Sequence, residues 1–323
     1  IFALLFGFTF YMQSNNQKKQ GKDFGYRFLW RLALLGVFAT WNAAFFPAGD
    51  VLLLFVVVGV VLFLTRSWSD RAIGVAAVVL LLQPVEWYHY IANLINPAHR
   101  LPDLKVAEMY GEVADYTKAG NWRDFLLGNV TLGQKASFLW AVNAGRFVQT
   151  AGLFLLGFFI GRKQLFMTNE KNIAFGTKVL IISAISFAPL YTLKELVMEN
   201  DPIVQQTVGT AFDMWQKLAF TLVLVASFIL LYQHKNFSKA VAGLRFYGKM
   251  SLTNYISQSI IGVFIYFPIG LNLTPYCGYT FSLLVGFLIF LLQLRFCKWW
   301  LARHKQGPLE YIWHKCTWIG TGK

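Results

Sequence analysis

The feature that most constrains this chain is a series of long, continuous apolar runs separated by short polar segments. Eight complete runs follow a partial one formed by the first twelve residues. A helix needs about 20 apolar residues to cross a bilayer, whereas the strands of a membrane barrel would alternate over about ten residues. The pattern predicts an all-α, polytopic transmembrane helical bundle of about nine helices, the first of them truncated. One further helix before it would bring the full-length protein to ten.

The charge pattern gives the expected orientation. Only 14% of the residues are charged, against about 25% in soluble proteins, so lipid is the expected main solvent and partner. Alternate polar segments are strongly basic, and together they hold 20 of the 29 Lys and Arg residues: 13–31, 65–71, 161–171, 233–249 and 295–323. The positive-inside rule places them in the cytoplasm. We therefore expect a multi-pass protein of the bacterial inner membrane with a cytoplasmic C-terminus, and we expect no nucleic acid partner.

The same pattern divides the chain into parts of one integral membrane domain, residues 1–323. Segment 93–135 is the longest polar stretch and is expected outside the cell, with short helices over 106–118 and 121–130. They would lie on the membrane surface, either as a plain interfacial loop or as a lid over a site. Segment 233–323 is expected to form a C-terminal block of two transmembrane helices and a basic cytoplasmic tail.

Polar side chains within or beside the apolar runs are the candidate site. Ionisable groups are expensive in a bilayer and are functional candidates by default. We predict one polar pocket that opens outward and is formed by Asn42, Asp50, Glu86, His89, Arg146, Asp213, Lys217, Asn254 and Gln258. Asn254 and Gln258 lie near the start of the run over 250–271, and they need polar neighbours because lipid offers none. The Cys and His spacings form no metal-ligand set, so no metal is expected.

The residues of this pocket allow several roles. Glu86 and His89 lie three residues apart, so His89 can act as a general base that Glu86 orients; the alternative is that both reach the interface within an aromatic belt. Asp213 and Lys217 lie four residues apart and can satisfy each other on one helix face. Arg146 has no local partner, so it either pairs across helices or reaches the interface.

Several short motifs resemble a known bacterial family. The early ones are residues 2–7 (FALLFG), 31–36 (RLALLG) and 49–52 (GDVL). The later ones are residues 248–255 (GKMSLTNY), followed by Gln258-Ser259, and residues 307–310 (GPLE). The chain resembles the YeiB-like membrane proteins, whose C-terminal part is a domain of unknown function, number 418, and the resemblance extends over nearly the whole sequence.

The resemblance implies an inner-membrane protein of about ten helices that is distantly related to membrane acyltransferases. These enzymes move acyl groups onto sugars or other acceptors, and acyl-CoA would be the donor here. The leading hypothesis is therefore an acyltransferase-like protein. Arg146 or Lys217 would hold the anionic donor, and His89 or a base in a preceding helix would activate the acceptor hydroxyl. A second hypothesis is a transporter or an exporter of lipids or metabolites, in which the same charged residues line a pathway without covalent chemistry. A scaffold without a ligand is the third.

Overall fold

The protein is an all-α membrane protein. The computed structural model describes residues 1–46, 48 and 50–319, and this part of the chain contains helices and no strand. Pro47 and Gly49, from the turn between the second and third apolar runs, lie outside the described residues, as do the last four residues of the basic tail. The described chain divides into two compact units, each assembled from three separate stretches.

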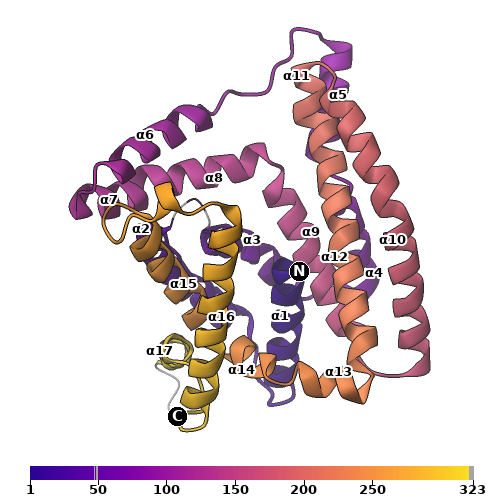
Figure 1. The fold of residues 1–323 in the computed structure, drawn as a ribbon. Helices are drawn as coiled ribbons and strands as arrows, with labels where there is room; N and C mark the ends of the chain where they lie inside the picture. The colour runs from indigo at the N-terminus through magenta and orange to yellow at the C-terminus, as the bar shows by residue number, and fades with distance from the viewer. Residues whose placement is uncertain (47, 49, 320–323) are drawn as a thin grey trace. The chain divides into compact units, whose positions relative to one another are not determined.

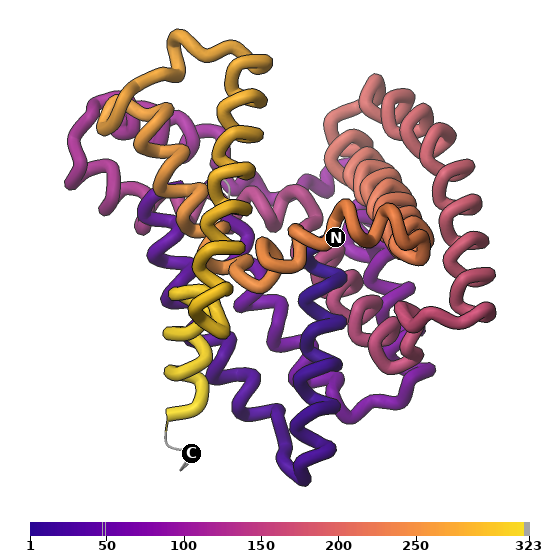
Figure 2. Tube along the Cα trace, turned by 60° about the horizontal axis from the view of Figure 1, so that its bottom comes forward, coloured from indigo at the N-terminus to yellow at the C-terminus, as the bar shows by residue number. Residues whose placement is uncertain are grey.

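Unit 1 consists of Ile1–Leu29, Leu54–Leu104 and Trp140–Ser238. Its helices are α1 (Phe2–Lys18), α4 (Asp70–Leu81), α5 (Pro84–Ile95), α9 (Arg146–Arg162), α10 (Glu170–Met198), α11 (Pro202–Val204), the π-helix η3 (Gln205–Gly209) and α12 (Thr210–Tyr232). Helix α9 packs against both α1 and α4, and α10 packs along α12. Figures 1 and 2 show the long helices α10 and α12 side by side.

Glycines allow α1 and α9 to approach at backbone distance. An ideal Cβ on Gly157 would lie only 1.9 Å from the carbonyl oxygen of Leu4, and one on Gly7 would lie 1.9 Å from that of Phe154. Small residues that let backbones meet are typical of helix pairs in membranes. Aromatic rings fill the remaining space, with Phe10 packed edge-on against Phe158. Helix α9 is therefore the buried centre of unit 1.

Unit 2 consists of Trp30–Leu53, Lys105–Leu139 and Lys239–Lys323. Its helices are α6 (Val106–Lys118), α7 (Trp122–Gly128), the π-helix η2 (Asn129–Gly133), α14 (Leu244–Lys249), α15 (Ser251–Tyr266), the 3-10 helix η4 (Thr274–Tyr276), α16 (Tyr279–Leu301) and α17 (Pro308–Thr317). Helices with residues in both units are α2 (Gly25–Phe45), α3 (Leu52–Thr65), α8 (Gln134–Asn143) and α13 (Lys235–Ala240). Phe125 of α7 packs against Val263 of α15 and against Ile269. Helices α6 and α7 occupy the two stretches for which short helices were expected.

Helices α15 and α17 cap each other. The carboxylate of Glu310, in the first turn of α17, accepts hydrogen bonds from the backbone N–H of Thr253 (2.9 Å) and from its hydroxyl (2.6 Å). The hydroxyl oxygen of Thr253 in turn accepts a bond from the N–H of Leu309 (3.2 Å). The first turn of a helix has N–H groups without intrahelical partners. Each helix therefore supplies an acceptor for the other, and this explains why Thr253 and the GPLE motif occur together.

Several helices are long and apolar enough to cross a membrane, but they are fewer than the nine apolar runs of the sequence. Four helices of the described residues qualify as spans, or six if each of two bent helix pairs is one span. The nine runs exceed this number because some fold into shorter helices, such as α3 with 14 residues and α15 with 16. Helices α10 and α16 bury only 6% and 11% of their apolar windows. Their exposed apolar faces suit lipid.

Candidate functional site

Two helix breaks in unit 1 create the candidate site. Helices α4 and α5 meet at a bend of 49°, where Gln83 has a left-handed backbone (φ 59°, ψ 59°) and Pro84 begins α5. Helices α8 and α9 are separated at Gly145, which also has a positive φ of 61°. Proline suits the first position of a helix because it has no N–H to satisfy. Broken helices at membrane depth are tolerated where protein or a cavity receives the freed backbone groups.

Glu86 brings the two breaks into contact. Its Oε1 lies 2.6 Å from the position that a Cβ on residue 145 would occupy, and the Thr210 methyl group lies 3.2 Å from that position. Residue 145 therefore needs glycine for two reasons, namely its positive φ and the space taken by the carboxylate. Glu86 is only 8% exposed. The sequence thus places a buried carboxylate at the point where α5 faces the start of α9.

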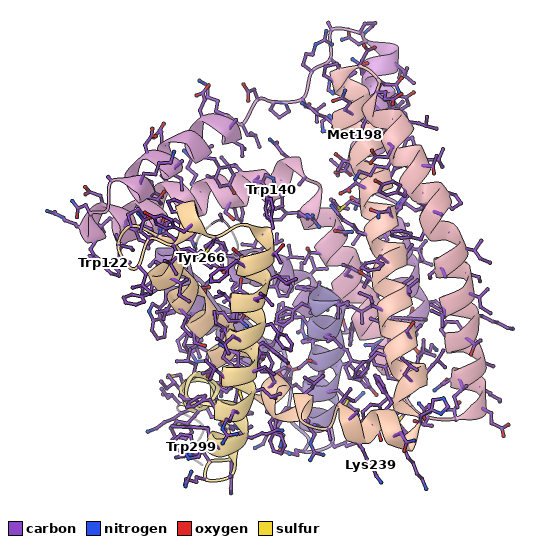
Figure 3. The ribbon with its side chains drawn as sticks, viewed as in Figure 1. Trp122, Trp140, Met198, Lys239, Tyr266 and Trp299 are labelled. Atoms are coloured by element: carbon purple, nitrogen blue, oxygen red, sulfur yellow. The ribbon has the colours of Figure 1, made fainter. Side chains whose placement is uncertain are left out.

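Arg146 is the first residue of α9 and lies beside this contact. Its Nη1 donates to Oε1 of Gln149 (3.3 Å), and its guanidinium lies 5.6 Å from the ring centre of Trp140; Figure 3 labels Trp140 on α8. Helix α12 supports both breaks. Gln149 donates to the carbonyl of Met214 (3.2 Å), and the indole N–H of Trp215 donates to the carbonyl of Leu81 at the end of α4 (2.9 Å).

Several buried polar atoms at these breaks have no hydrogen-bond partner within the described residues. They are Nε2 and Oε1 of Gln83, Oε2 of Glu86 and Nε of Arg146. Leaving a buried polar group unpaired costs roughly 1–3 kcal/mol. Such atoms gathered at one place mark a site that a polar ligand would satisfy. We call Gln83, Glu86, Gly145 and Arg146 the helix-break site.

The predicted base, His89, has a different partner from the one expected. Its Nδ1 lies 3.0 Å from Nε2 of His99, and the two rings are stacked. Asn93 donates to the carbonyl of His99 (3.0 Å) and fixes the segment that carries it. No hydrogen bond between His89 and Glu86 occurs in the described part of the chain. The pairing of Glu86 with His89 therefore stays a prediction, and His99 is the residue that sequence reasoning did not include.

Asp213 lies in a triad of charges. Lys217 donates to Oδ2 of Asp213, which is the pairing expected from their spacing. Lys194 of α10 lies 3.4 Å from the other carboxylate oxygen. The side chain of Asp213 is 18% exposed. The two lysines together outweigh the single carboxylate by one positive charge, and the three groups link α10 to α12.

In unit 2, Asn42 and Asp50 form a pair at the start of α3. The Oδ1 of Asp50 accepts from Nδ2 of Asn42 (3.1 Å) and from the N–H of Leu52 (3.2 Å), and its Oδ2 accepts from the N–H of Leu53 (3.3 Å). The carboxylate thus caps the first turn of α3. Burial raises the pKa of Asp50, and these hydrogen bonds partly oppose the shift. The phenol oxygen of Tyr255 accepts from the N–H of Val51 (3.2 Å).

Asn254 and Gln258 have the polar neighbours that the sequence required. Gln258 donates to the hydroxyl of Tyr247 (2.7 Å) and to Oε1 of Gln293 (3.0 Å). Asn254 donates to the carbonyl of Tyr247 (3.1 Å) and to Sγ of Cys297 (3.3 Å). Because these amide groups are paired, the network joins α14, α15 and α16. Sequence reasoning missed Tyr247 and Gln293.

The nine predicted residues are divided between the units, with five in unit 1 and four in unit 2. The structure brings Glu86 and Arg146 to the same pair of helix breaks, and it places the ring of His89 against His99. The single pocket containing all nine stays a prediction. Gln83 was missed altogether. The sequence did contain a sign of it, namely an amide residue directly before a proline within an apolar run. A proline disfavours helical geometry in the residue that precedes it.

The relatives of this chain place it in a family. A family model described as "Protein of unknown function (DUF418)" matches residues 160–320. The uncharacterized protein YxaH of Bacillus subtilis is 22% identical over 99% of this chain and 78% of its own length. An uncharacterized 39.9 kDa protein in the amylase 3′ region of Bacillus acidopullulyticus is 35% identical over 28% of this chain and 25% of its own length.

A third relative is the uncharacterized protein YeiB of Escherichia coli. It is 31% identical over 24% of this chain and 20% of its own length. No solved structure matches the chain. The matches to YxaH and YeiB agree with the family model and with the motifs in the sequence. The chain belongs to the YeiB-like DUF418 family of membrane proteins.

Proposed function

We propose that this membrane protein transfers an acyl group to an acceptor that is held at the helix-break site. The observation that carries the proposal is the carboxylate of Glu86, which is buried without a cation and has one oxygen free within the described structure. A buried carboxylate in this state is suited to accept a proton from a hydroxyl or amine. A sugar hydroxyl is the acceptor that the family resemblance suggests.

The chemistry balances with an acyl-CoA donor. Glu86 takes the proton of the acceptor hydroxyl while the hydroxyl oxygen attacks the thioester carbonyl. The resulting tetrahedral intermediate collapses, the C–S bond breaks, and the protonated Glu86 returns its proton to the leaving thiolate. Arg146 has a free Nε, so its guanidinium can donate to the oxyanion or to an anionic part of the donor. The amide of Gln83 would orient the acceptor.

Transport is the second candidate, and the two helix breaks favour it. Discontinuous helices with polar groups at the break are typical of substrate sites in secondary transporters. The side chains of Gln83, Glu86 and Arg146 would then bind a polar substrate without covalent chemistry. In that case Glu86 would carry a proton or contact the substrate, and no acyl product would form.

The protein's environment belongs to the same proposal. We place it in the bacterial inner membrane with the basic segments and the C-terminus in the cytoplasm, in accordance with the positive-inside rule. Helices α6 and α7 would lie at the outer surface. Their role as a lid over a site is part of the proposal, and a plain interfacial position is the alternative.

The test uses the full-length protein purified in lipid nanodiscs. Native mass spectrometry would detect a co-purifying acyl-CoA, and labelled acyl-CoA would be followed into acceptor products. We expect Glu86→Gln to abolish transfer while acyl-CoA is still bound, and Arg146→Ala to lose the bound donor. Glu199→Gln, an exposed carboxylate in the same unit, is the control.

Two results would overturn acyl transfer at the helix-break site with Glu86 as the base. If Glu86→Gln transfers acyl groups as fast as the wild type, Glu86 is not the base. If the wild type moves a polar substrate across vesicles without any acylated product, and Glu86→Gln stops this movement, the helix-break site belongs to a transporter.

A further inference from the structure

A basic pocket lies at the end of α16 in unit 2. It has a volume of about 360 Å³ and is lined by the ends of α14 and α16 and by the turn that follows α16. The lining side chains include Phe246, Lys249, Leu301, Arg303, His304 and Lys305. We call it the tail pocket. None of its lining residues is acidic, so its charge is not balanced locally.

The cations of the tail pocket are available to a ligand. Among the described residues, the side-chain ammonium groups of Lys249 and Lys305 take part in no hydrogen bond or ion pair, and both residues are exposed. The guanidinium of Arg303 lies 5.0 Å from the ring centre of Trp299. The nearest acid along the chain, Glu310, is bound to Thr253. A concave site with three unpaired cations attracts an anion.

Stabilisation of helix ends explains only part of this arrangement. Lys249 lies in the last turn of α14, where a cation interacts favourably with the helix dipole. Arg303 and Lys305 lie beyond the end of α16. They sit in a turn that is closed by the hydrogen bond from the indole of Trp300 to the carbonyl of Gln306 (2.9 Å). The ring of His304 is stacked on Trp300 and shapes the same turn.

The position of the pocket along α16 indicates where its ligand comes from. Apolar side chains on α16 are exposed, among them Leu284 (61%) and Phe287 (59%). The basic residues follow this apolar stretch, together with the half-exposed Trp299 (52%), which Figure 3 labels. Tryptophan at the end of an apolar span is typical of the membrane–water interface. If α16 spans the bilayer, this end of the helix would place the pocket at the level of lipid head groups, where basic pockets bind anionic ones.

We propose that the tail pocket binds the phosphate of an anionic phospholipid, with Lys249, Arg303 and Lys305 as its cationic contacts. A phosphate diester carries one negative charge and accepts hydrogen bonds from both amine and guanidinium groups. This binding site is separate from the helix-break site. It does not depend on acyl transfer or on transport.

The test measures lipid binding by the full chain. The protein would be exchanged into nanodiscs of phosphatidylcholine containing increasing phosphatidylglycerol, and bound lipids would be counted by native mass spectrometry after release. We expect selective retention of phosphatidylglycerol. The double variant Lys249→Gln/Lys305→Gln should weaken this retention on the order of tenfold to thirtyfold, since each basic residue near a membrane surface contributes about 1 kcal/mol.

A matched variant and a second ligand make the result decisive. Lys18→Gln/Lys19→Gln removes the same charge from another exposed basic segment, and it should leave phosphatidylglycerol retention unchanged. Equal retention by wild type and the Lys249/Lys305 variant would overturn the proposal, as would equal retention of both lipids. Competition with inorganic phosphate distinguishes a lipid phosphate from a soluble one as the ligand. If it displaces phosphatidylglycerol from the wild type at millimolar concentration, the pocket takes soluble phosphate, and the lipid assignment is overturned.

Discussion

Glu86 and Asp213 are two carboxylates of the same unit in opposite surroundings. Glu86 is buried against Gly145 without a cation in the described structure, whereas Asp213 lies between Lys194 and Lys217. Removing the charge of a buried, unpaired carboxylate relieves desolvation, while removing one member of a partly buried ion pair leaves the others uncompensated. The two amide substitutions should therefore act in opposite directions.

We expect Glu86→Gln to keep or raise the unfolding temperature. Asp213→Asn should lower the free energy of unfolding by about 1–3 kcal/mol, given its partial exposure. Scanning fluorimetry of both variants in the same detergent would measure the difference. A stabilised Asp213→Asn, or a Glu86→Gln that unfolds at a clearly lower temperature, would contradict these assignments.

Asp50 gives a prediction of pH dependence. Burial raises the pKa of its carboxyl in the folded protein. As pH rises above about 4, the ordinary value for aspartate, the unfolded chain releases this proton before the folded chain does. The folded state then binds more protons, so the contribution of Asp50 to stability falls until pH passes the raised pKa.

The substitution Asp50→Asn removes this proton and keeps an acceptor for α3. We expect the unfolding temperature of the wild type, relative to that of Asp50→Asn, to decrease between about pH 4 and pH 7. Unfolding curves of both proteins across this range would measure it. A difference that stays constant with pH would show that Asp50 ionises equally easily in both states.

At the scale of single residues, the charged members of the candidate site could be predicted from the sequence, whereas the backbone conformation that places them could not. Glu86 and Arg146 stand out because ionisable groups are rare in apolar runs. Gln83 does not, since its importance comes from a left-handed backbone that no periodicity reveals. The partners of His89 and Gln258 come from segments distant in the chain or from a loop, and spacing on one helix cannot find them.

At the scale of the element, the reciprocal cap between α15 and α17 can be measured directly. Glu310→Ala and Thr253→Val should each lower the free energy of unfolding by about 1–2 kcal/mol, because each leaves helix-end N–H groups without an acceptor. The double variant should lose less than the sum of the two. A double-mutant cycle measures this coupling.

Thr280→Val is the matched control for this cycle, because Thr280 is exposed at the start of α16 and makes no side-chain hydrogen bond among the described residues. It should be nearly neutral. Strict additivity of Glu310→Ala and Thr253→Val would mean that the two side chains act independently, contrary to the observed bonds.

The contact between α1 and α9 depends on glycine. In Gly157→Ala, the new methyl group would lie 1.9 Å from the carbonyl oxygen of Leu4, and overpacking of this kind costs about 1–3 kcal/mol. Gly262 is also helical but has open space around its Cβ position. Gly262→Ala should therefore stabilise by roughly 0.5–1 kcal/mol through helix propensity. Unfolding measurements that ranked the two variants in reverse would contradict the packing.

The elements themselves were largely predictable, and their interruptions were not. Apolar runs fix helices because a membrane segment must satisfy its backbone internally. The runs over residues 72–91 and 137–160, however, each fold as two helices. Pro84 is compatible with a helix start as well as with a kink, and Gly145 is one of several glycines in its neighbourhood. Only the packing of Glu86 and α12 around these positions decides that the helices break there.

At the scale of the whole molecule, three native cysteines test the orientation. Helix α16 separates Cys277 from Cys316, both partly exposed, while Cys297 is buried within it. If α16 crosses the membrane and the C-terminus is cytoplasmic, an impermeant maleimide should label Cys277 in intact spheroplasts. It should label Cys316 only after lysis.

Variants that keep a single cysteine would separate the signals, and Cys297 alone should react only after unfolding. If Cys316 is labelled in intact spheroplasts and Cys277 is protected, the orientation of α16 is the opposite of the one expected. Labelling of both from the same side would mean that α16 does not cross the membrane.

The reciprocal cap also has a consequence for how the chain is made. Thr253 and Glu310 are 57 residues apart, and α16 lies between them. At a synthesis rate of about 5–20 residues per second, roughly 3–11 s pass between the appearance of the first partner and that of the second. During this interval the first turn of α15 must rely on water or on the insertion machinery for its acceptors. Nascent chains arrested before residue 308 should therefore hold α15 less firmly than chains that include α17.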